Sequence, residues 1–226
     1  MLTSRSWTCA AVVVALCARA GAASLPFPGL FSPGGARMDK PHPAIAALHD
    51  YRATLHTNLG DLAIKFEPDH APNAVRNFIK LAHRGFYDGS RFYCVFKDKM
   101  ILAGDPTGKG TGDVGYALDY EASPLGHTPG TLAMDRRPDA REGGGTTRKN
   151  SGSRFLINVG KQHHLDRDYT VFARITDGLE VARRIGAAAC RDHGGRPQPL
   201  EDMVIERITV EKTGPKKASS DPNQED

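Results

Sequence analysis

The glycine-rich segment "GDPTGKGTG" at residues 104–112 has the composition of a loop that could bind phosphate. In such a loop the backbone N–H groups point at the phosphate oxygens and a lysine neutralises their charge. The pattern requires four residues between its first two glycines and a Ser or Thr directly after the lysine. Here three residues separate Gly104 from Gly108, and Gly110 follows Lys109. The spacing therefore favours an ordinary glycine-rich loop.

Two adjacent histidines and one isolated cysteine are further candidates for chemistry. On a strand, His163 and His164 would point to opposite faces, and no other His, Cys or carboxylate group has the spacing of metal ligands. We therefore expect surface histidines and no metal site. Cys94 belongs to no Cys–His signature, and the sequence has no serine nucleophile elbow. A covalent mechanism is not expected.

Cys94 lies in a segment with the pattern of a strand. In "RFYCVFKDKMILAGDP", residues 91–106, Phe92, Cys94 and Phe96 occupy alternate positions and would share one face. The segment then passes through an apolar run into a turn-forming Gly-Asp-Pro sequence. A cysteine at the centre of such a strand needs an explanation that its own pattern does not supply.

The rest of the chain predicts two helices among many short strands. Residues 71–85 carry Pro72 in the first turn and repeat apolar residues at helical spacing. Residues 177–189 begin with Asp177 and Glu180 in the arrangement of a capping box. Strands are expected at 53–57, 62–67, 130–134, 153–160, 169–175 and 203–211, the first two forming a hairpin. This order indicates a closed or nearly closed β structure with helices at its ends.

Length and composition are those of one soluble domain. The chain has 226 residues, of which 39% are hydrophobic and 25% charged. Its formal charge is +4, and Arg5 and Arg19 near the N-terminus supply two of these charges. So small an excess gives little reason to expect nucleic acid or a membrane surface as a partner.

The N-terminus predicts export from the cytoplasm. Arg5 precedes the apolar run "CAAVVVALCA", and small residues follow, so residues 1–22 form a predicted signal peptide cleaved after Ala20 or Ala22. An uncleaved membrane anchor is the alternative, although the run is shorter than the roughly 20 residues that a span needs. The expected organisation is a flexible leader at 23–50, one domain at 51–212 and a disordered polar tail at 213–226. The mature protein would be secreted or periplasmic.

Signal cleavage would leave two cysteines in the mature chain. Cys9 and Cys17 lie within the signal, whereas Cys94 and Cys190 lie in the predicted domain. In an oxidising compartment these two could form a disulfide, or they could remain separate thiols. The sequence does not give the distance that decides between them.

Five motifs in order resemble those of a cyclophilin-type peptidyl-prolyl isomerase. They are "LHTNLGDLAIKFEPDHAPNAVRNFIKLAHRGFYDGSRFYCV", "MILAGDPTGKGTG", "HTPGTLAM", "SGSRFLINVG" and "LDRDYTVFARITDGLEVARRI". The resemblance covers residues 53–212. It implies a mainly β fold, a closed antiparallel barrel of about eight strands capped by two α-helices, in agreement with the predicted elements.

The resemblance also implies a reaction without a cofactor or covalent step. Members of this family accelerate cis–trans rotation of X-Pro bonds in polypeptides. A hydrophobic pocket holds the proline ring, hydrogen bonds hold the neighbouring peptide, and an arginine donates to the amide nitrogen. The expected partners are Pro-containing polypeptides, with no nucleic acid and, after signal cleavage, no membrane. We expect a monomer.

Carried over position by position, the resemblance assigns candidate site residues and departures from the family pattern. Cys94 stands in place of the catalytic arginine, and Leu102 replaces the glutamine that orients it. Arg154 replaces another glutamine, and Arg136 stands near an asparagine that pairs with substrate backbone. Met100 and Leu165 match pocket residues, Leu156 replaces a pocket aromatic, His164 replaces a tryptophan and Tyr169 replaces a histidine.

These departures leave two functional hypotheses. In the first, the protein is a weakened isomerase of exported proteins, and Arg154, which shares a strand face with Leu156, supplies a substitute guanidinium. Arg154 could equally be a solvated arginine at a strand end. In the second, the domain is a non-catalytic module that binds Pro-containing segments or another protein. The basic loop at 135–150 could select acidic or extended clients, or be a solvated insertion without a specific role.

Overall fold

The computed structural model describes residues 48–136 and 149–213. The predicted signal peptide, most of the leader, nearly all of the tail and most of the basic loop lie outside these residues. Within them, no helix is long and apolar enough to cross a membrane.

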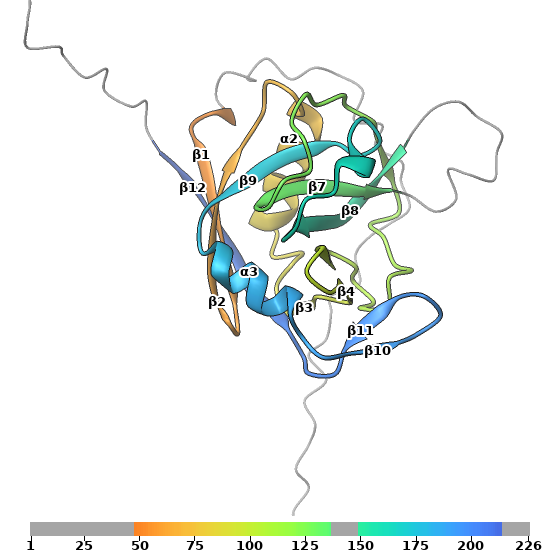
Figure 1. Cartoon of the computed structure of the whole chain (residues 1–226). Coiled ribbons are helices and arrows are strands. Elements are labelled where there is room, and N and C mark those ends of the chain that lie inside the picture. Colours follow the sequence, from red (N-terminus) through yellow and green to blue (C-terminus); the bar gives the residue numbers. More distant parts are fainter. Residues whose placement is uncertain (1–47, 137–148, 214–226) are drawn as a thin grey trace, which may run out of the picture. The chain divides into compact units, whose positions relative to one another are not determined.

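The described chain forms a curled antiparallel sheet with two α-helices (Figure 1). The ten strands of the sheet follow the order β3-β12-β1-β2-β9-β7-β8-β5-β4, with β6 paired to β8, and β10 and β11 form a separate hairpin. The elements are β1 (Tyr51–Thr57), β2 (Gly60–Phe66), α2 (Pro72–His83), β3 (Ser90–Arg91), β4 (Cys94–Phe96), β5 (Met100–Ala103), β6 (Ala117–Asp119), β7 (Thr131–Arg136), β8 (Lys149–Asn158), a 3₁₀ turn (His163–Leu165), β9 (Val171–Asp177), α3 (Leu179–Gly186), β10 (Cys190–Asp192), β11 (Pro197–Pro199) and β12 (Val204–Lys212). The predicted fold class is confirmed, although some strands are only two or three residues long.

The two end strands of the sheet order are neighbours in the chain. Strands β3 and β4 are separated only by Phe92 and Tyr93, whose N–H groups bond to chain segments at the two ends of the strand order. Phe92 donates to the carbonyl of Met203 at 2.9 Å, and Tyr93 donates to the carbonyl of Leu102 at 3.0 Å. Phe92 and Tyr93 therefore connect the two ends of the curled sheet, without pairing between β3 and β4.

The helix α2 fills the main core. Its residues Val75, Phe78, Ile79 and Ala82 are buried as the helical spacing predicts, and the Phe78 ring lies 5.2 Å from that of Phe172. Ala71 offers no side-chain cap. The carboxylate of Glu121 instead accepts hydrogen bonds from the N–H groups of Asn73 and Ala74, at 2.9 Å each. A distant loop thus completes the first turn of α2.

The predicted capping box of the second helix is wrong. Asp177 still belongs to β9, paired with Ala63, and the N-cap of α3 is Gly178, without a side-chain cap. Gly178 has φ +85°, and a Cβ there would lie 2.1 Å from the carbonyl oxygen of Asp61. The chain therefore leaves the strand through a turn that only glycine fits.

The glycine-rich loop binds a carboxylate of its own chain. The buried Asp105 accepts hydrogen bonds from the N–H of Thr107 at 2.6 Å, from its hydroxyl at 2.8 Å and from the N–H of Gly112 at 3.1 Å. Burial raises the pKa of Asp105, but the hydrogen bonds from Thr107 and the neighbouring glycines outweigh it and lower the pKa overall. The backbone N–H groups of this loop thus bind the Asp105 carboxylate of the same chain.

Asp105→Asn should destabilise the fold in a pH-dependent way. Because the pKa of Asp105 is lower in the folded chain, its ionised form stabilises the fold above the unfolded pKa of about 3.9, and that stability is lost as the pH falls through the folded pKa. Urea unfolding should show the largest gap between wild type and variant above about pH 5, closing toward about pH 2. The exposed Asp177→Asn is the control. A gap that stays constant with pH would contradict this account.

Candidate functional site

One face of four neighbouring strands carries the candidate site. Cys94 on β4 is paired with Leu102 on β5, Leu102 with Leu156 on β8, and Leu156 with Ala133 on β7. These four residues therefore form a row across the sheet. The adjacent row, Val95, Ile101, Ile157 and Leu132, belongs to the main core. The alternation places the Cys94 row on the opposite face.

An apolar cluster occupies the middle of this face. Leu156, Ala133 and Val171 are buried, and Met100, Leu102, Leu125 and Tyr169 pack against them. Four predicted site residues, namely Met100, Leu102, Leu156 and Tyr169, are thus brought together. The role of this apolar cluster in binding stays a prediction.

A pocket of about 330 Å³ adjoins the cluster and is much more polar. It shares Leu102 and Tyr169 with the cluster and carries three guanidinium groups and one carboxylate. Its lining residues are Tyr93, Cys94, Phe96, Leu102, Gly110, Asp135, Arg136, Arg154, Tyr169 and Arg196. Five of these were not among the site residues predicted from the sequence, namely Tyr93, Phe96, Gly110, Asp135 and Arg196.

Arg154 is held by three oxygens of the protein. Its Nη1 donates to the carbonyl of Gly110 at 2.9 Å, its Nη2 donates to the carbonyl of Arg136 at 2.8 Å, and its Nε lies 3.1 Å from Asp135 Oδ2 in an ion pair. Only 2% of Arg154 is exposed. The expectation of a solvated strand-end arginine is therefore wrong, because the side chain lies under the pocket floor and joins β8 to the glycine-rich loop.

The carboxylate that faces Arg154 is itself shielded from solvent. Burial raises the pKa of Asp135, while the positive charge of Arg154 and the hydrogen bond from the Arg136 N–H oppose the rise. The hydroxyl of Tyr93 also points at Asp135, at 3.4 Å. The opposite charges of Asp135 and Arg154 thus offset each other at the wall of the pocket.

Arg136 and Tyr169 meet at the rim. The guanidinium carbon of Arg136 lies 5.5 Å from the centre of the Tyr169 ring, which is a cation–π contact. Both residues were predicted to bind substrate from different motifs. The contact joins the polar pocket to the apolar cluster.

Cys94 is a buried thiol at one wall of the pocket. Burial raises the pKa of Cys94 to about 11, although the positive charge of Arg196 opposes the rise. The thiol is therefore neutral near pH 7 and a poor nucleophile. Cys190 is also a free thiol, and its Sγ lies 3.9 Å from the carbonyl oxygen of Val95, next to Cys94 in the chain. The structure thus holds the two cysteines as separate thiols.

Two predicted residues lie apart from the polar pocket. His164 and Leu165 belong to the 3₁₀ turn at His163–Leu165, where His164 is exposed and Leu165 is buried. The expectation that adjacent histidines lie on a strand is wrong here. His163 instead bonds to the Asp166 carboxylate at 3.2 Å. Neither His164 nor Leu165 lines the 330 Å³ pocket.

Comparison with known proteins identifies the family. The family "Cyclophilin type peptidyl-prolyl cis-trans isomerase/CLD" matches residues 52–210. The peptidyl-prolyl cis-trans isomerase A of Mycobacterium tuberculosis is 38% identical over 175 residues, covering 70% of this chain and 91% of that protein. The chain belongs to the cyclophilin family. By homology this cyclophilin is a peptidyl-prolyl cis–trans isomerase, as predicted.

Other relatives agree in sequence and in structure. The peptidyl-prolyl cis-trans isomerase B of Streptomyces anulatus is 39% identical over 178 residues, 70% of this cyclophilin and 95% of its own length. A crystal structure of a Cryptosporidium parvum cyclophilin has a TM-score of 0.62 and 27% identity, covering 71% of this chain and 96% of that one. A second structure of that protein, with a TM-score of 0.61, was solved in the presence of the dipeptide Ala-Pro.

Native Cys94 should react slowly with alkylating reagents. Because the pKa of Cys94 is about 11, iodoacetamide at pH 8 should label it on the order of a hundredfold more slowly in the folded cyclophilin than in urea. Peptide mapping by mass spectrometry separates Cys94 from Cys190, and the urea-unfolded chain is the reference. Equal rates in the two states would show an activated thiol and contradict this assignment.

Proposed function

We propose that this cyclophilin isomerises X-Pro bonds of exported proteins at the Cys94 face, with lower activity than a relative that carries arginine at that position. The observation that carries the proposal is the pairing of Cys94 with Leu102 across β4 and β5. By resemblance these positions hold an arginine and the glutamine that orients it. Here both are neutral, and they face each other across the two strands.

The reaction needs selective stabilisation of a twisted amide. Rotation about an X-Pro bond meets a barrier of about 18–20 kcal/mol, because conjugation is lost on the way. A site accelerates rotation only if it binds the twisted amide better than either planar form. The apolar cluster around Leu156 and Tyr169 supplies a surface for the proline ring. A neutral thiol at Cys94 supplies no charge-assisted hydrogen bond, which supports weaker catalysis.

Two further observations support the substrate class and the compartment. The related Cryptosporidium parvum protein was solved in the presence of Ala-Pro, and we extend the recognition of a Pro-containing peptide to this chain. The predicted signal peptide at 1–22 supports substrates outside the cytoplasm.

A second candidate is a non-catalytic module that binds Pro-containing segments. The neutral pair Cys94 and Leu102 favours it, because the same loss that weakens catalysis leaves the apolar cluster intact. The two candidates differ in one property: a module binds the peptide without changing its exchange rate.

The mature domain should accelerate exchange of an X-Pro peptide, measured by NMR. The double variant Cys94→Arg with Leu102→Gln should raise kcat/KM about tenfold or more, since one charge-assisted hydrogen bond contributes about 1.5–3 kcal/mol. Cys94→Met is the matched control, as long as arginine's stem but uncharged, and should not gain activity. A folded wild type that binds the peptide without accelerating its exchange would establish the binding module instead.

The exported protein should lack its first 20 or 22 residues. Mass spectrometry of the protein from the envelope or medium of producing cells should find an N-terminus at Gly21 or Ala23. A chain retaining Met1 in the membrane fraction would support the uncleaved anchor. A chain retaining Met1 in the cytoplasm would contradict export.

A further inference from the structure

The hairpin of β10 and β11 is built to hold one side chain in place. His193 and Arg196 exchange both backbone hydrogen bonds, at 3.2 and 3.4 Å. The two residues between them, Gly194 and Gly195, have φ values of +64° and +79°. This is a two-residue type I′ turn, which matches the twist of the strands. Pro197 follows and restricts the backbone of Arg196 further.

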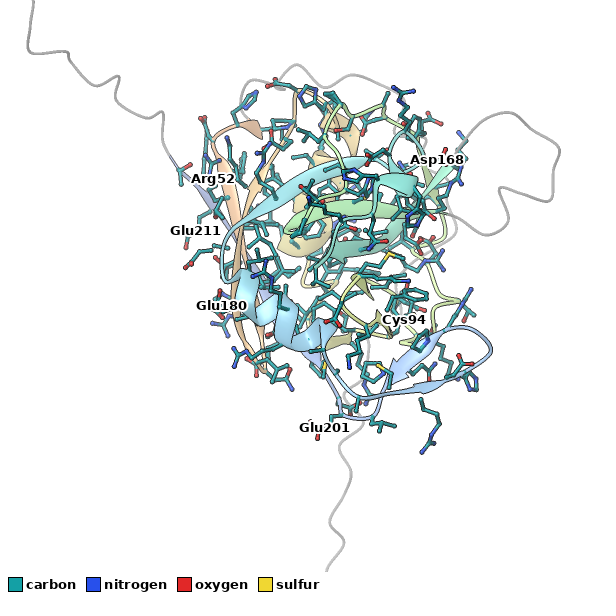
Figure 2. All side chains as sticks on the ribbon, in the orientation of Figure 1. Arg52, Cys94, Asp168, Glu180, Glu201 and Glu211 are labelled. Atoms are coloured by element: carbon teal, nitrogen blue, oxygen red, sulfur yellow. The ribbon has the colours of Figure 1, made fainter. Side chains whose placement is uncertain are left out.

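The hairpin packs beside the strand that carries Cys94. Strand β11 lies against β4, and Cys190 at the start of β10 contacts the carbonyl oxygen of Val95. Figure 1 shows the hairpin beside β4, and Figure 2 labels Cys94, the first residue of that strand. Arg196, at the end of the turn, reaches the pocket and donates from Nη1 to the carbonyl of Gly110 at 3.0 Å.

Three guanidinium groups line the pocket, and they differ in their contacts within the protein. All three nitrogens of Arg154 lie at protein oxygens, and Arg136 lies over the Tyr169 ring. Arg196 is exposed, and among the described residues its guanidinium makes one hydrogen bond, through Nη1. Its Nε and Nη2 donors remain for a ligand.

Arg196 is also the arginine whose charge acts on Cys94. Burial raises the pKa of the Cys94 thiol, and the positive charge of Arg196 opposes that rise. Arg196 and Cys94 line the same pocket, and the strand β11 that follows Arg196 lies against β4, which carries Cys94. Arg154 is therefore a support for the pocket, whereas Arg196 keeps donors that no described residue occupies, in the pocket that Cys94 also lines.

We propose that Arg196 is a catalytic residue of this cyclophilin, which donates a hydrogen bond from its free guanidinium nitrogens to the prolyl amide as that amide twists. This role rests on the proposed function. As conjugation is lost, the amide nitrogen gains a localised lone pair and accepts a hydrogen bond more strongly than either planar form does. No covalent bond forms or breaks. The donor comes from a hairpin beside β4 instead of from β4 itself.

The test compares Arg196→Ala with Arg191→Ala. Both remove one positive charge from an exposed position of the same hairpin, but Arg191 does not line the pocket. NMR exchange of an Ala-Pro-containing peptide gives kcat, and titration of the same peptide gives Kd. We expect Arg196→Ala to lose roughly a hundredfold in kcat with Kd changed less than about threefold. Arg196→Lys should recover part of the loss, and Arg191→Ala should match wild type.

Other outcomes would contradict either the role of Arg196 or the proposed isomerase function. Equal kcat in Arg196→Ala and Arg191→Ala, with wild type active, would overturn the role of Arg196 alone. A loss confined to peptides with an acidic residue before proline would also overturn it, because Arg196 would then recognise a side chain. A wild type that binds the peptide without catalysis would overturn the proposed function, and with it this role.

Discussion

The antiparallel register of β4, β5, β8 and β7 is the constraint on which the site depends. The register pairs each residue of one row with the next across neighbouring strands, so that the row shares one face of the sheet. This row is Cys94, Leu102, Leu156 and Ala133. A slip of one residue would turn this row into the core and expose the row that begins at Val95. The same hydrogen bonds between these strands therefore determine which residues line the pocket and which pack in the core.

The charged groups of the pocket make different contacts and therefore have different structural roles. Asp135 and Arg154 form a shielded ion pair that holds the floor, and the remaining bonds of Arg154 tie β8 to Gly110. Arg136 is held at the rim by Tyr169. Arg196 shares the Gly110 carbonyl with Arg154 but comes from a different element. In the proposed role, the Arg196 guanidinium faces the substrate, while β4 carries the neutral Cys94 thiol.

The sequence patterns predicted the features that depend on residues close together in the chain. The helix α2 and the first hairpin follow from apolar spacing and turn residues, and the shared face of Arg154 and Leu156 follows from strand alternation. The burial of Arg154 could not be predicted, because its partner Asp135 lies on another strand. The Arg196 hairpin was missed because its strands are three residues long and β11 begins and ends with proline. Its Gly-Gly pair, however, is a recognisable type I′ turn.

The central claim is that a Pro-containing peptide binds across the Cys94 face, with its ring on the apolar cluster and its amide toward the Arg196 guanidinium. A crystal structure of the mature domain with an Ala-Pro-containing peptide tests it most directly. We predict the proline ring against Leu102, Leu156 and Tyr169, and an Arg196 nitrogen within about 3.5 Å of the prolyl amide. A peptide seated elsewhere, or an Arg196 side chain turned away from it, would contradict the account.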